Sequence, residues 1–482
     1  MNNNQLSFSL RHDLPWEITR PVCDMAAFFN YHAAEQGSAA LTLTRTGCGV
    51  RAVLEADGRR FTAEESWQAN NDEPASGEAA RCIKLAVLRA FSGLTGVQPQ
   101  LPWGILTGVR PGKLAHKLLD AGVSADALPD FLAERYLLPV PQGRLLRDIA
   151  VRQKSLLPDE ERLRDAGVYI GVPYCPSRCS YCSFPAGIVP QDEESQQNFV
   201  NLIEQDIQNV VQLLSMHRLS LRSLYIGGGT PTSLGEKAFS RLLRAAGRLL
   251  DIACVKEFTV EAGRPDCFSY GKLAAMEAAG VNRISVNPQT FHDRTLRLIG
   301  RRHTVEDFYR AYALVRRSAI PVVNMDLIIG LPEESEADIA YSLEQAEQLA
   351  PENFTIHTLT LKRSAPLFGS AMTLDADAAA RMVERGRRIA QAMGLQPYYL
   401  YRQHYMLGHL ANIGYARPGT ESVYNIQMME ERHPVIGIGP ASASKAPLAD
   451  GHHLRKLNMP KNVAAYAKEL PELCRKRAAL FD

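Results

Sequence analysis

The stretch Val168-Tyr-Ile-Gly-Val-Pro-Tyr-Cys-Pro-Ser-Arg-Cys-Ser-Tyr-Cys-Ser-Phe184 carries the strongest signal in the chain. An apolar, strand-like run leads into three cysteines, Cys175, Cys179 and Cys182, with the spacing C-x3-C-x2-C. Three thiolates are one short of the four that normally hold an iron–sulfur cluster, so a [4Fe-4S] cluster bound here would keep one iron open to a non-protein ligand. The spacing therefore predicts a catalytic metal centre rather than a structural one.

Two other uses of closely spaced cysteines fit the stretch less well. Structural zinc sites pair a C-x2-C with a second ligand pair, and no such partner follows within about thirty residues. A disulfide is disfavoured because the three cysteines are crowded and the N-terminus has no signal-peptide pattern. The remaining cysteines of the nine are scattered singly, as reduced thiols usually are; they are Cys23, Cys48, Cys82, Cys254, Cys267 and Cys474.

Composition predicts a globular protein of the cytoplasm. The chain has 482 residues, of which 46% are hydrophobic and 22% charged, which suits about three domains with large cores. A net charge of +2 gives no global field that favours nucleic acid or a membrane surface as partner. No uninterrupted apolar stretch reaches spanning length.

The pattern along the chain predicts three segments: an accessory region over residues 1–165, a β/α region over 166–370 and a C-terminal α/β region over 371–482. Residues 1 to about 60 contain β-rich runs, with a turn at Asp57-Gly58, and predict a small α+β unit. From Glu78 to about Gln153 the pattern is helical, and Pro111 starts one helix. The charged stretch Asp159 to Asp165 predicts a linker or a solvated helix.

The middle segment alternates strands with helices, which predicts a parallel sheet. Strands are expected at Tyr169–Val172, Ser223–Ile226, Glu257–Glu261, Arg283–Val286, Val322–Ile328 and Phe354–Leu361. Helices are expected at Ser195–Leu214, Glu236–Leu250, Tyr270–Ala279, Val305–Arg317 and Ser335–Leu349, with another at Ala376–Met393. Six β/α units make a partial barrel, and barrel sites gather at the C-terminal ends of the strands.

The cysteine spacing is the signature of the radical S-adenosylmethionine (radical SAM) enzymes, and later blocks resemble the oxygen-independent coproporphyrinogen III oxidases. These blocks are Gly227-Gly-Gly-Thr-Pro-Thr232, Val260-Glu-Ala-Gly263, Ile284-Ser-Val-Asn-Pro-Gln-Thr-Phe291 and Asp326-Leu-Ile-Ile-Gly-Leu-Pro332. Flanking segments resemble the HemZ branch, the coproporphyrinogen dehydrogenase-like proteins with an added N-terminal region. They are Leu106-Thr-Gly-Val-Arg-Pro-Gly-Lys-Leu114, Tyr398-Tyr-Leu-Tyr-Arg-Gln403 and Asn412-Ile-Gly-Tyr-Ala-Arg-Pro-Gly419.

The resemblance implies a fold, two cofactors and a set of site residues. The fold would be a partial (β/α)6 radical SAM barrel, and the cofactors a [4Fe-4S] cluster and S-adenosylmethionine (SAM). The cluster ligands would be Cys175, Cys179 and Cys182. The SAM-contact positions would be Tyr169, Gly228, Gly229, Thr230, Glu261, Gln289, Arg301 and Asp326. Taken singly, each of these could instead be a turn, a core residue or a salt bridge at the barrel rim.

The resemblance also implies a substrate, coproporphyrinogen III, whose propionates need cationic partners, and a low-potential electron donor of the flavodoxin or ferredoxin type. Candidate propionate ligands are Arg178, Arg264, Arg301, Arg363 and Arg402. His357 is expected to be a core histidine satisfied by its neighbours. The decarboxylating enzymes carry a fourth cysteine where this chain has Phe184, a residue shared with haem-chaperone relatives. Two functions stay open: oxidative decarboxylation of coproporphyrinogen III, or haem binding without turnover.

Overall fold

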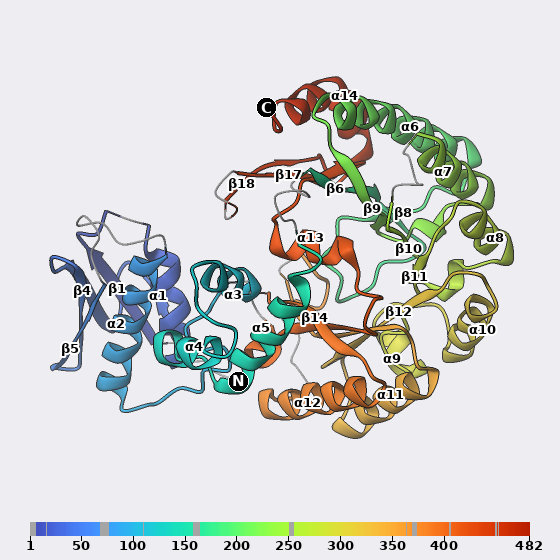
Figure 1. The fold of residues 1–482 in the computed structure, drawn as a ribbon. Helices are drawn as coiled ribbons and strands as arrows, with labels where there is room; N and C mark the ends of the chain where they lie inside the picture. The colour runs from blue at the N-terminus through green and yellow to red at the C-terminus, as the bar shows by residue number, and fades with distance from the viewer. Residues whose placement is uncertain are drawn as a thin grey trace. The chain divides into compact units, whose positions relative to one another are not determined.

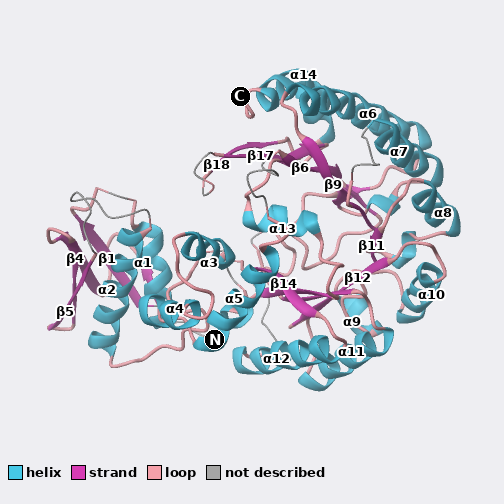
Figure 2. Cartoon of the chain, in the orientation of Figure 1, coloured by secondary structure: helices cyan, strands magenta, loops and turns pink. Residues whose placement is uncertain are grey.

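The computed structural model describes residues 6–15, 17–67, 77–108, 110–157, 164–249, 255–362, 364–368, 374–403, 406–448, 451 and 453–482. Its internal contacts divide the chain into two compact units (Figures 1 and 2). One unit comprises residues 1–108 and 124–144, and the other residues 109–123 and 145–482. The three-segment division at residues 165 and 370 remains a proposal.

The first unit is a five-stranded sheet covered by helices. Its strand order is β2-β1-β3-β4-β5, formed by Tyr31–Ala33, Leu6–His12, Ala39–Arg45, Gly49–Ala56 and Arg59–Ser66. The turn between β4 and β5 places Asp57 and Gly58 at φ 52° and 71°, which suits a tight hairpin and confirms the expected turn. Helices α1 (Thr19–Ala26) and α2 (Glu78–Thr95) bury their apolar faces in the same core as the sheet.

The second unit contains the predicted parallel sheet. Strands β6 (Asp165–Val172), β9 (Ser220–Gly228), β10 (Glu257–Glu261), β11 (Arg283–Ser285), β12 (Val322–Ile329) and β13 (Asn353–Thr358) lie in chain order and pair in parallel. All six begin within a few residues of their predicted positions. Asp165, expected in a linker or solvated helix, instead begins β6, and residues 159–163 of that stretch lie outside the described part of the chain.

Helices follow the strands and lie along the outer face of the curved sheet (Figure 1). They are α6 (Glu193–Met216), α7 (Glu236–Leu249), α8 (Tyr270–Ala278), α10 (Val305–Arg316), α11 (Glu336–Leu349) and α12 (Ala376–Ala392). The short helix α9 (Asp293–Leu298) lies inside this arc, where Leu296 packs with Ile328 of β12 (Figure 1). Side-chain caps fix several starts, because Asp192, Thr304, Ser335 and Asp375 accept hydrogen bonds from the first turn of α6, α10, α11 and α12. The partial β/α barrel is therefore confirmed.

The C-terminal segment extends this sheet at both edges. The full order is β14-β15-β13-β12-β11-β10-β9-β6-β16-β17-β18, an open sheet of eleven strands. β14 (Gln396–Tyr401) and β15 (Asn412–Ala416) add to β13, and β15 pairs with it antiparallel. β16 (Val435–Ile438) pairs in parallel with β6, so it is a seventh parallel strand. β17 (Ala443–Pro447) and β18 (Leu454–Asn458) complete that edge, and α14 (Val463–Ala478) packs on α6.

A helix from the C-terminal segment, α13 (Val423–Glu430), lies within the concave side of the sheet (Figure 1). Glu257, the first residue of β10, accepts hydrogen bonds from the Ser422 hydroxyl at 2.8 Å and the Val423 amide at 2.5 Å. Arg283, the first residue of β11, donates to Asn353 at the start of β13. This polar belt occupies the N-terminal ends of the strands and leaves their C-terminal ends for the site. In the described part of the chain, no helix is both long and apolar enough to span a bilayer.

Candidate cluster and cofactor site

The three cysteines lie on one loop that starts where β6 ends. The loop is pinned at its base by two short parallel strands, β7 (Tyr174–Cys175) and β8 (Gly187–Ile188). Within it, the Cys182 amide donates to the Cys179 carbonyl at 3.2 Å. The Ser180 amide donates to Ile299 O at 3.0 Å, which ties the loop to the end of α9. The loop is therefore held from inside and from a neighbouring element.

The glycine-rich segment after β9 packs directly on the first cysteine. The Thr230 amide donates to Tyr174 O at 2.6 Å, and its hydroxyl lies 3.5 Å from Cys175 Sγ. A Cβ at Gly229 would lie 2.4 Å from Tyr174 O and 3.0 Å from Cys175 Sγ. Gly228 has φ +115°, a conformation that side chains other than glycine rarely adopt. The glycines therefore bring the backbone of this segment against the cysteine loop.

Glu261 ends β10 and faces the same glycines. Its carboxylate accepts hydrogen bonds from Tyr225 Oη at 2.6 Å and the Gly228 amide at 3.1 Å. Burial raises the pKa of Glu261 to about 7, although both of these hydrogen bonds act in the opposite direction. Tyr169 and Tyr225 stack with Tyr424 of α13, with ring centroids 4.4 to 6.0 Å apart. This aromatic stack is a wall beside the carboxylate.

Asp326, in β12, anchors a second polar group on the concave face. Its carboxylate accepts from Asn324 Nδ2 at 2.8 Å and lies 3.6 Å from His357 Nε2. His357 Nδ1 in turn lies 3.3 Å from Tyr401 Oη. The histidine is satisfied by its neighbours, as expected. These contacts and burial compete at Asp326: burial raises its pKa, and the His357 contact together with the Asn324 hydrogen bond lowers it below the usual value.

Gln289 and Arg301 complete the predicted set. Gln289 adopts φ 68° just after β11, and its backbone N–H donates to the backbone carbonyl of Asp326 at 3.1 Å. Its Oε1 is buried without a hydrogen-bond partner. Arg301 is buried, and Nη1 donates to the carbonyls of Asn287 at 2.7 Å and Gly263 at 3.2 Å. Nη2 lies 3.4 Å from Tyr181 Oη on the cysteine loop. The predicted residues therefore lie at or near the C-terminal ends of the strands, around the cysteine loop.

Comparison with known proteins identifies the family. The model of the radical SAM superfamily matches residues 169–346. The chain is 38% identical over 389 residues to the oxygen-independent coproporphyrinogen-III oxidase-like protein HemZ of Bacillus subtilis, covering 80% of this chain and 77% of HemZ. It is 30% identical over 300 residues to the heme chaperone HemW of Escherichia coli, covering 61% of this chain and 74% of HemW. The chain belongs to the radical SAM superfamily, among the relatives of HemZ.

A solved structure supports the fold. Coproporphyrinogen III oxidase (HemN) of Escherichia coli, described as a radical SAM enzyme, superposes with a TM-score of 0.51 at 18% identity. The match covers 67% of this chain and 73% of that structure. At this identity the likeness concerns the fold alone. It agrees with the partial barrel built from the strands described above.

Radical SAM proteins use a [4Fe-4S] cluster and SAM, and the residues of this chain fit that cluster. Three reduced thiols lie on one loop, and Gly229 leaves the space beside Cys175 Sγ that a side chain would fill. Burial raises the pKa of both Cys175 and Cys182. Among the described residues, no three His, Cys, Asp or Glu side chains gather closely enough to hold a single metal ion. In a cluster, each thiolate binds a different iron atom.

The arginines expected to bind propionates are engaged elsewhere in this radical SAM chain. Arg264 donates to Ser177 and Asp266, and Arg402 donates to His409 O at 3.1 Å. Arg178 is exposed and donates to Ser364 O at 3.1 Å. Arg363 and Cys254 lie outside the described residues. Arg178, Arg264 and Arg402 are therefore each bound to different protein groups.

Sequence reasoning missed several contributors to the site. Tyr424 and Tyr225 complete the aromatic wall, and Asp266 with His303 lies behind Arg264. A tyrosine in a strand or helix gives no local signal that distinguishes it from a core residue. Phe184, the residue in place of a fourth cysteine, has 46% of its surface exposed, and Tyr174 of the same loop packs on Phe199.

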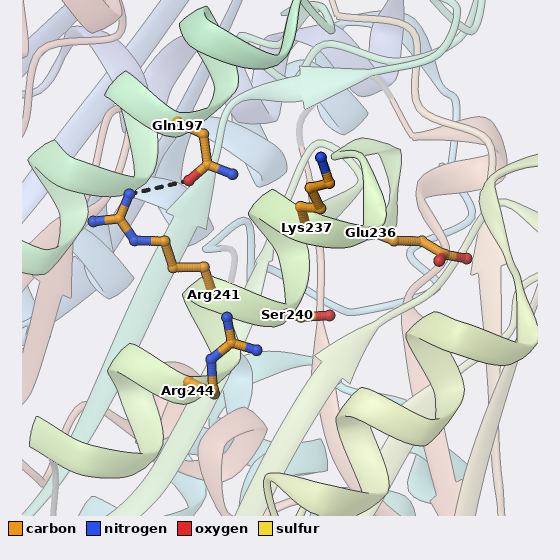
Figure 3. A pocket seen from close by; sticks show the side chains of 6 residues that line it. All are labelled: Gln197, Glu236, Lys237, Ser240, Arg241 and Arg244. Atoms are coloured by element: carbon orange, nitrogen blue, oxygen red, sulfur yellow. Dashed lines mark hydrogen bonds between the residues drawn. The ribbon is translucent and has the colours of Figure 1, made fainter.

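A separate surface hollow of about 460 Å³ lies between α6 and α7 (Figure 3). Its lining residues are Gln197, Glu236, Lys237, Ser240, Arg241 and Arg244. Arg241 is held there because its Nη1 donates to Gln197 Oε1 at 3.0 Å and its Nη2 donates to Glu204 Oε2. None of the predicted cofactor residues lines this hollow, so it is not the candidate site.

Proposed function

We propose that this chain is an oxygen-independent oxidase that converts propionate side chains of coproporphyrinogen III to vinyl groups. The observation that carries the proposal is the 38% identity to the oxidase-like protein HemZ, which extends over 80% of this chain and so well beyond the residues matched by the superfamily model. The assignment is also supported because the proposed SAM-binding residues lie at or near the C-terminal ends of the barrel strands, where barrel enzymes have their active sites.

In this proposal Cys175, Cys179 and Cys182 hold the cluster, and Tyr169, Gly228, Gly229, Thr230, Glu261, Gln289, Arg301 and Asp326 hold SAM. When bound, the two cofactors together supply a one-electron reduction and a carbon-centred radical. The glycines let backbone amides approach the ligand, and the Glu261 carboxylate accepts hydrogen bonds from it. The stack of Tyr169, Tyr225 and Tyr424 excludes water from one side of the site, which protects a reactive intermediate.

The overall reaction removes two hydrogen atoms and one carbon dioxide from each of two propionates. SAM and an external electron acceptor would together take up the two electrons released per propionate, and a low-potential flavodoxin or ferredoxin would supply the electron that reduces the cluster. We place this chemistry in the cytoplasm. His357 lies 3.6 Å from Asp326 and is itself contacted by Tyr401, so these two residues position the Asp326 carboxylate for the proposed contact with SAM.

The alternative is a haem-binding chaperone that keeps the cluster motif. It is favoured by the 30% identity to the heme chaperone HemW and by Phe184 in place of a fourth cysteine. An anaerobic assay separates the two functions. Reduced protein, SAM and coproporphyrinogen III should yield carbon dioxide and a two-vinyl product, and the Cys179→Ser variant should yield neither. One-to-one haem binding with no vinyl product under a competent electron donor would reject the oxidase.

A further inference from the structure

Arg264 leaves the end of β10 and reaches the cysteine loop, where it is 3% exposed. Its Nη2 donates to Ser177 Oγ at 2.8 Å, and its Nη1 donates to Ser177 O at 3.4 Å. The same Nη1 lies 3.6 Å from Cys179 Sγ, within the range of a hydrogen bond to sulfur. A buried guanidinium therefore faces the middle cysteine of the motif.

The guanidinium is fixed in this orientation from behind. Asp266 binds it in a bidentate manner, with Oδ1 accepting from Nε at 3.1 Å and Oδ2 from Nη2 at 3.0 Å. His303 Nδ1 lies 3.6 Å from the same carboxylate. Ser177 is held in turn, because its hydroxyl donates to Gly300 O at 2.9 Å. Paired groups of this kind orient an arginine more rigidly than a single contact does.

All five N–H donors of Arg264 are used in this arrangement. A guanidinium has five, and the acceptors are the two Asp266 oxygens, the two Ser177 oxygens and Cys179 Sγ. None remains for a substrate carboxylate, so Arg264 is not a propionate ligand. Arg301, the other buried arginine nearby, places its Nη1 on the carbonyls of Gly263 and Asn287, and its guanidinium also interacts with the Cys179 thiol. Arg264 and Arg301 are therefore both buried guanidinium groups at this sulfur.

We propose that Arg264 is a positioning residue that donates a hydrogen bond to the Cys179 sulfur and thereby raises the reduction potential of the cluster. The inference rests on the proposed ligation of the cluster by Cys179. Hydrogen bonds and positive charge at the ligand sulfurs favour the reduced, more negative state of an iron–sulfur cluster. The electron from the donor would then enter at a less negative potential.

The test is a redox titration of anaerobically reconstituted protein, followed by electron paramagnetic resonance, after iron and sulfide have been measured. Arg264→Gln should keep full iron and sulfide. At a fixed solution potential, the ratio of reduced to oxidised cluster in this variant should fall about tenfold. For a one-electron couple this corresponds to a shift of the cluster's reduction potential by about 59 mV to a more negative value. Arg264→Lys keeps the positive charge but not the planar guanidinium with its paired N–H donors, so it should shift the reduction potential less.

Arg178→Lys is the matched control, because Arg178 is on the same loop, donates to Ser364 O rather than to sulfur, and its charge, which acts on Cys182, is kept by the lysine. At the same solution potential, the ratio of reduced to oxidised cluster in this variant should stay within about twofold of that in the parent. An unchanged potential in Arg264→Gln with full iron would overturn the proposal. Loss of iron in both Arg264 variants would also overturn it, since the role would then be structural. A full cluster in Cys179→Ser would instead reject the ligation on which the inference rests.

Discussion

At the scale of single residues, Glu261 shows how burial sets the chemistry of one side chain. Its carboxyl group has a pKa of about 7 because burial outweighs the hydrogen bonds from Tyr225 and Gly228. Near neutral pH the group is therefore close to half protonated. Only the ionised form offers all its lone pairs to a ligand.

Affinity for SAM should consequently depend on pH through Glu261. Because the pKa is raised to about 7, acidification from pH 7 to pH 6 should weaken SAM binding about fivefold as the carboxylate is protonated. Anaerobic calorimetry on the protein with its cluster measures this. Glu261→Gln should bind SAM more weakly at pH 8 and with a flat pH profile. Glu430→Gln, which alters a second carboxyl group with a pKa of about 7, should keep the parental profile.

The cysteines give a second test at this scale. Cys175→Ser, Cys179→Ser and Cys182→Ser should each abolish the visible absorbance of the cluster and cleavage of SAM, because each removes one of three proposed ligands. Cys48→Ser, a change in the first unit, should leave both intact. A motif variant with full iron, full sulfide and normal SAM cleavage would contradict the assignment.

At the scale of elements, the start of α3 (Pro111–Asp120) packs against the end of α13. A Cβ at Gly112 would lie 2.9 Å from Glu430 Oε1, so the glycine leaves room for that carboxyl group at the N-terminus of α3. Glu431, the next residue, pairs with Arg110, with Lys113 at 3.0 Å and with Lys445 at 2.9 Å. The two glutamates therefore join α3 to α13, each by a different interaction.

The pKa values of these two glutamates move in opposite directions. Burial raises the pKa of Glu430 to about 7. At Glu431 burial is outweighed by Lys445, Arg110 and Lys113, which lower the pKa to about 2. A raised carboxyl pKa means that the stabilising contribution is fully present below the ordinary carboxyl pKa and is lost as pH rises from there through about 7. A lowered one means the reverse: the contribution is present above the ordinary carboxyl pKa and is lost on acidification.

The parent should therefore lose free energy of unfolding as pH rises, and Glu430→Gln should not show this loss. The free energy of unfolding of the parent, relative to the variant, should fall by roughly 2 to 3 kcal/mol between pH 5 and pH 8. Glu431→Gln should instead destabilise the protein at pH 8. Urea denaturation of both variants at the two pH values measures these differences. Equal pH profiles for parent and Glu430→Gln would show that Glu430 is ionised throughout.

At the scale of the whole molecule, helix α14 fastens the edge of the sheet that begins at β16, beside the strand that leads into the cysteine loop. Arg477 of α14 is 1% exposed, pairs with buried Asp206 of α6 and donates to Gly437 O in β16 at 2.7 Å. Tyr466 Oη accepts from the Gly439 amide at 2.8 Å and donates to Asp206. β16 lies beside β6, the strand that leads into the loop.

Loss of this buried pair should be costly. Arg477→Ala leaves Asp206 without its buried partner and should lower the free energy of unfolding by about 3 to 5 kcal/mol. Arg475→Ala is the control, because Arg475 is largely exposed and its ion pair with Glu472 should contribute less than about 1 kcal/mol. Chemical denaturation compares the two variants. A similar, small loss in both would mean that α14 does not fasten this edge.

The sequence by itself determined the local elements and the chemistry of the cysteine motif. Apolar runs and capping residues specify the six predicted strands and their helices locally, which is why β10 has its predicted bounds and α6 begins after Asp192. Helix α9 and strand β16 were not predicted. The spacing of Cys175, Cys179 and Cys182 likewise places three thiols on one loop without any tertiary contact.

The tertiary structure alone decided which distant segments meet. β16 joins β6 across more than 250 residues, α13 enters the concave side of the sheet, and Arg264 faces Cys179 rather than a substrate. Local pattern cannot give these contacts, because each depends on the direction in which a strand end or a loop projects once the sheet has curved. An arginine has the same sequence signature whether it meets a sulfur, a carbonyl or solvent. Only its neighbours in space distinguish these roles.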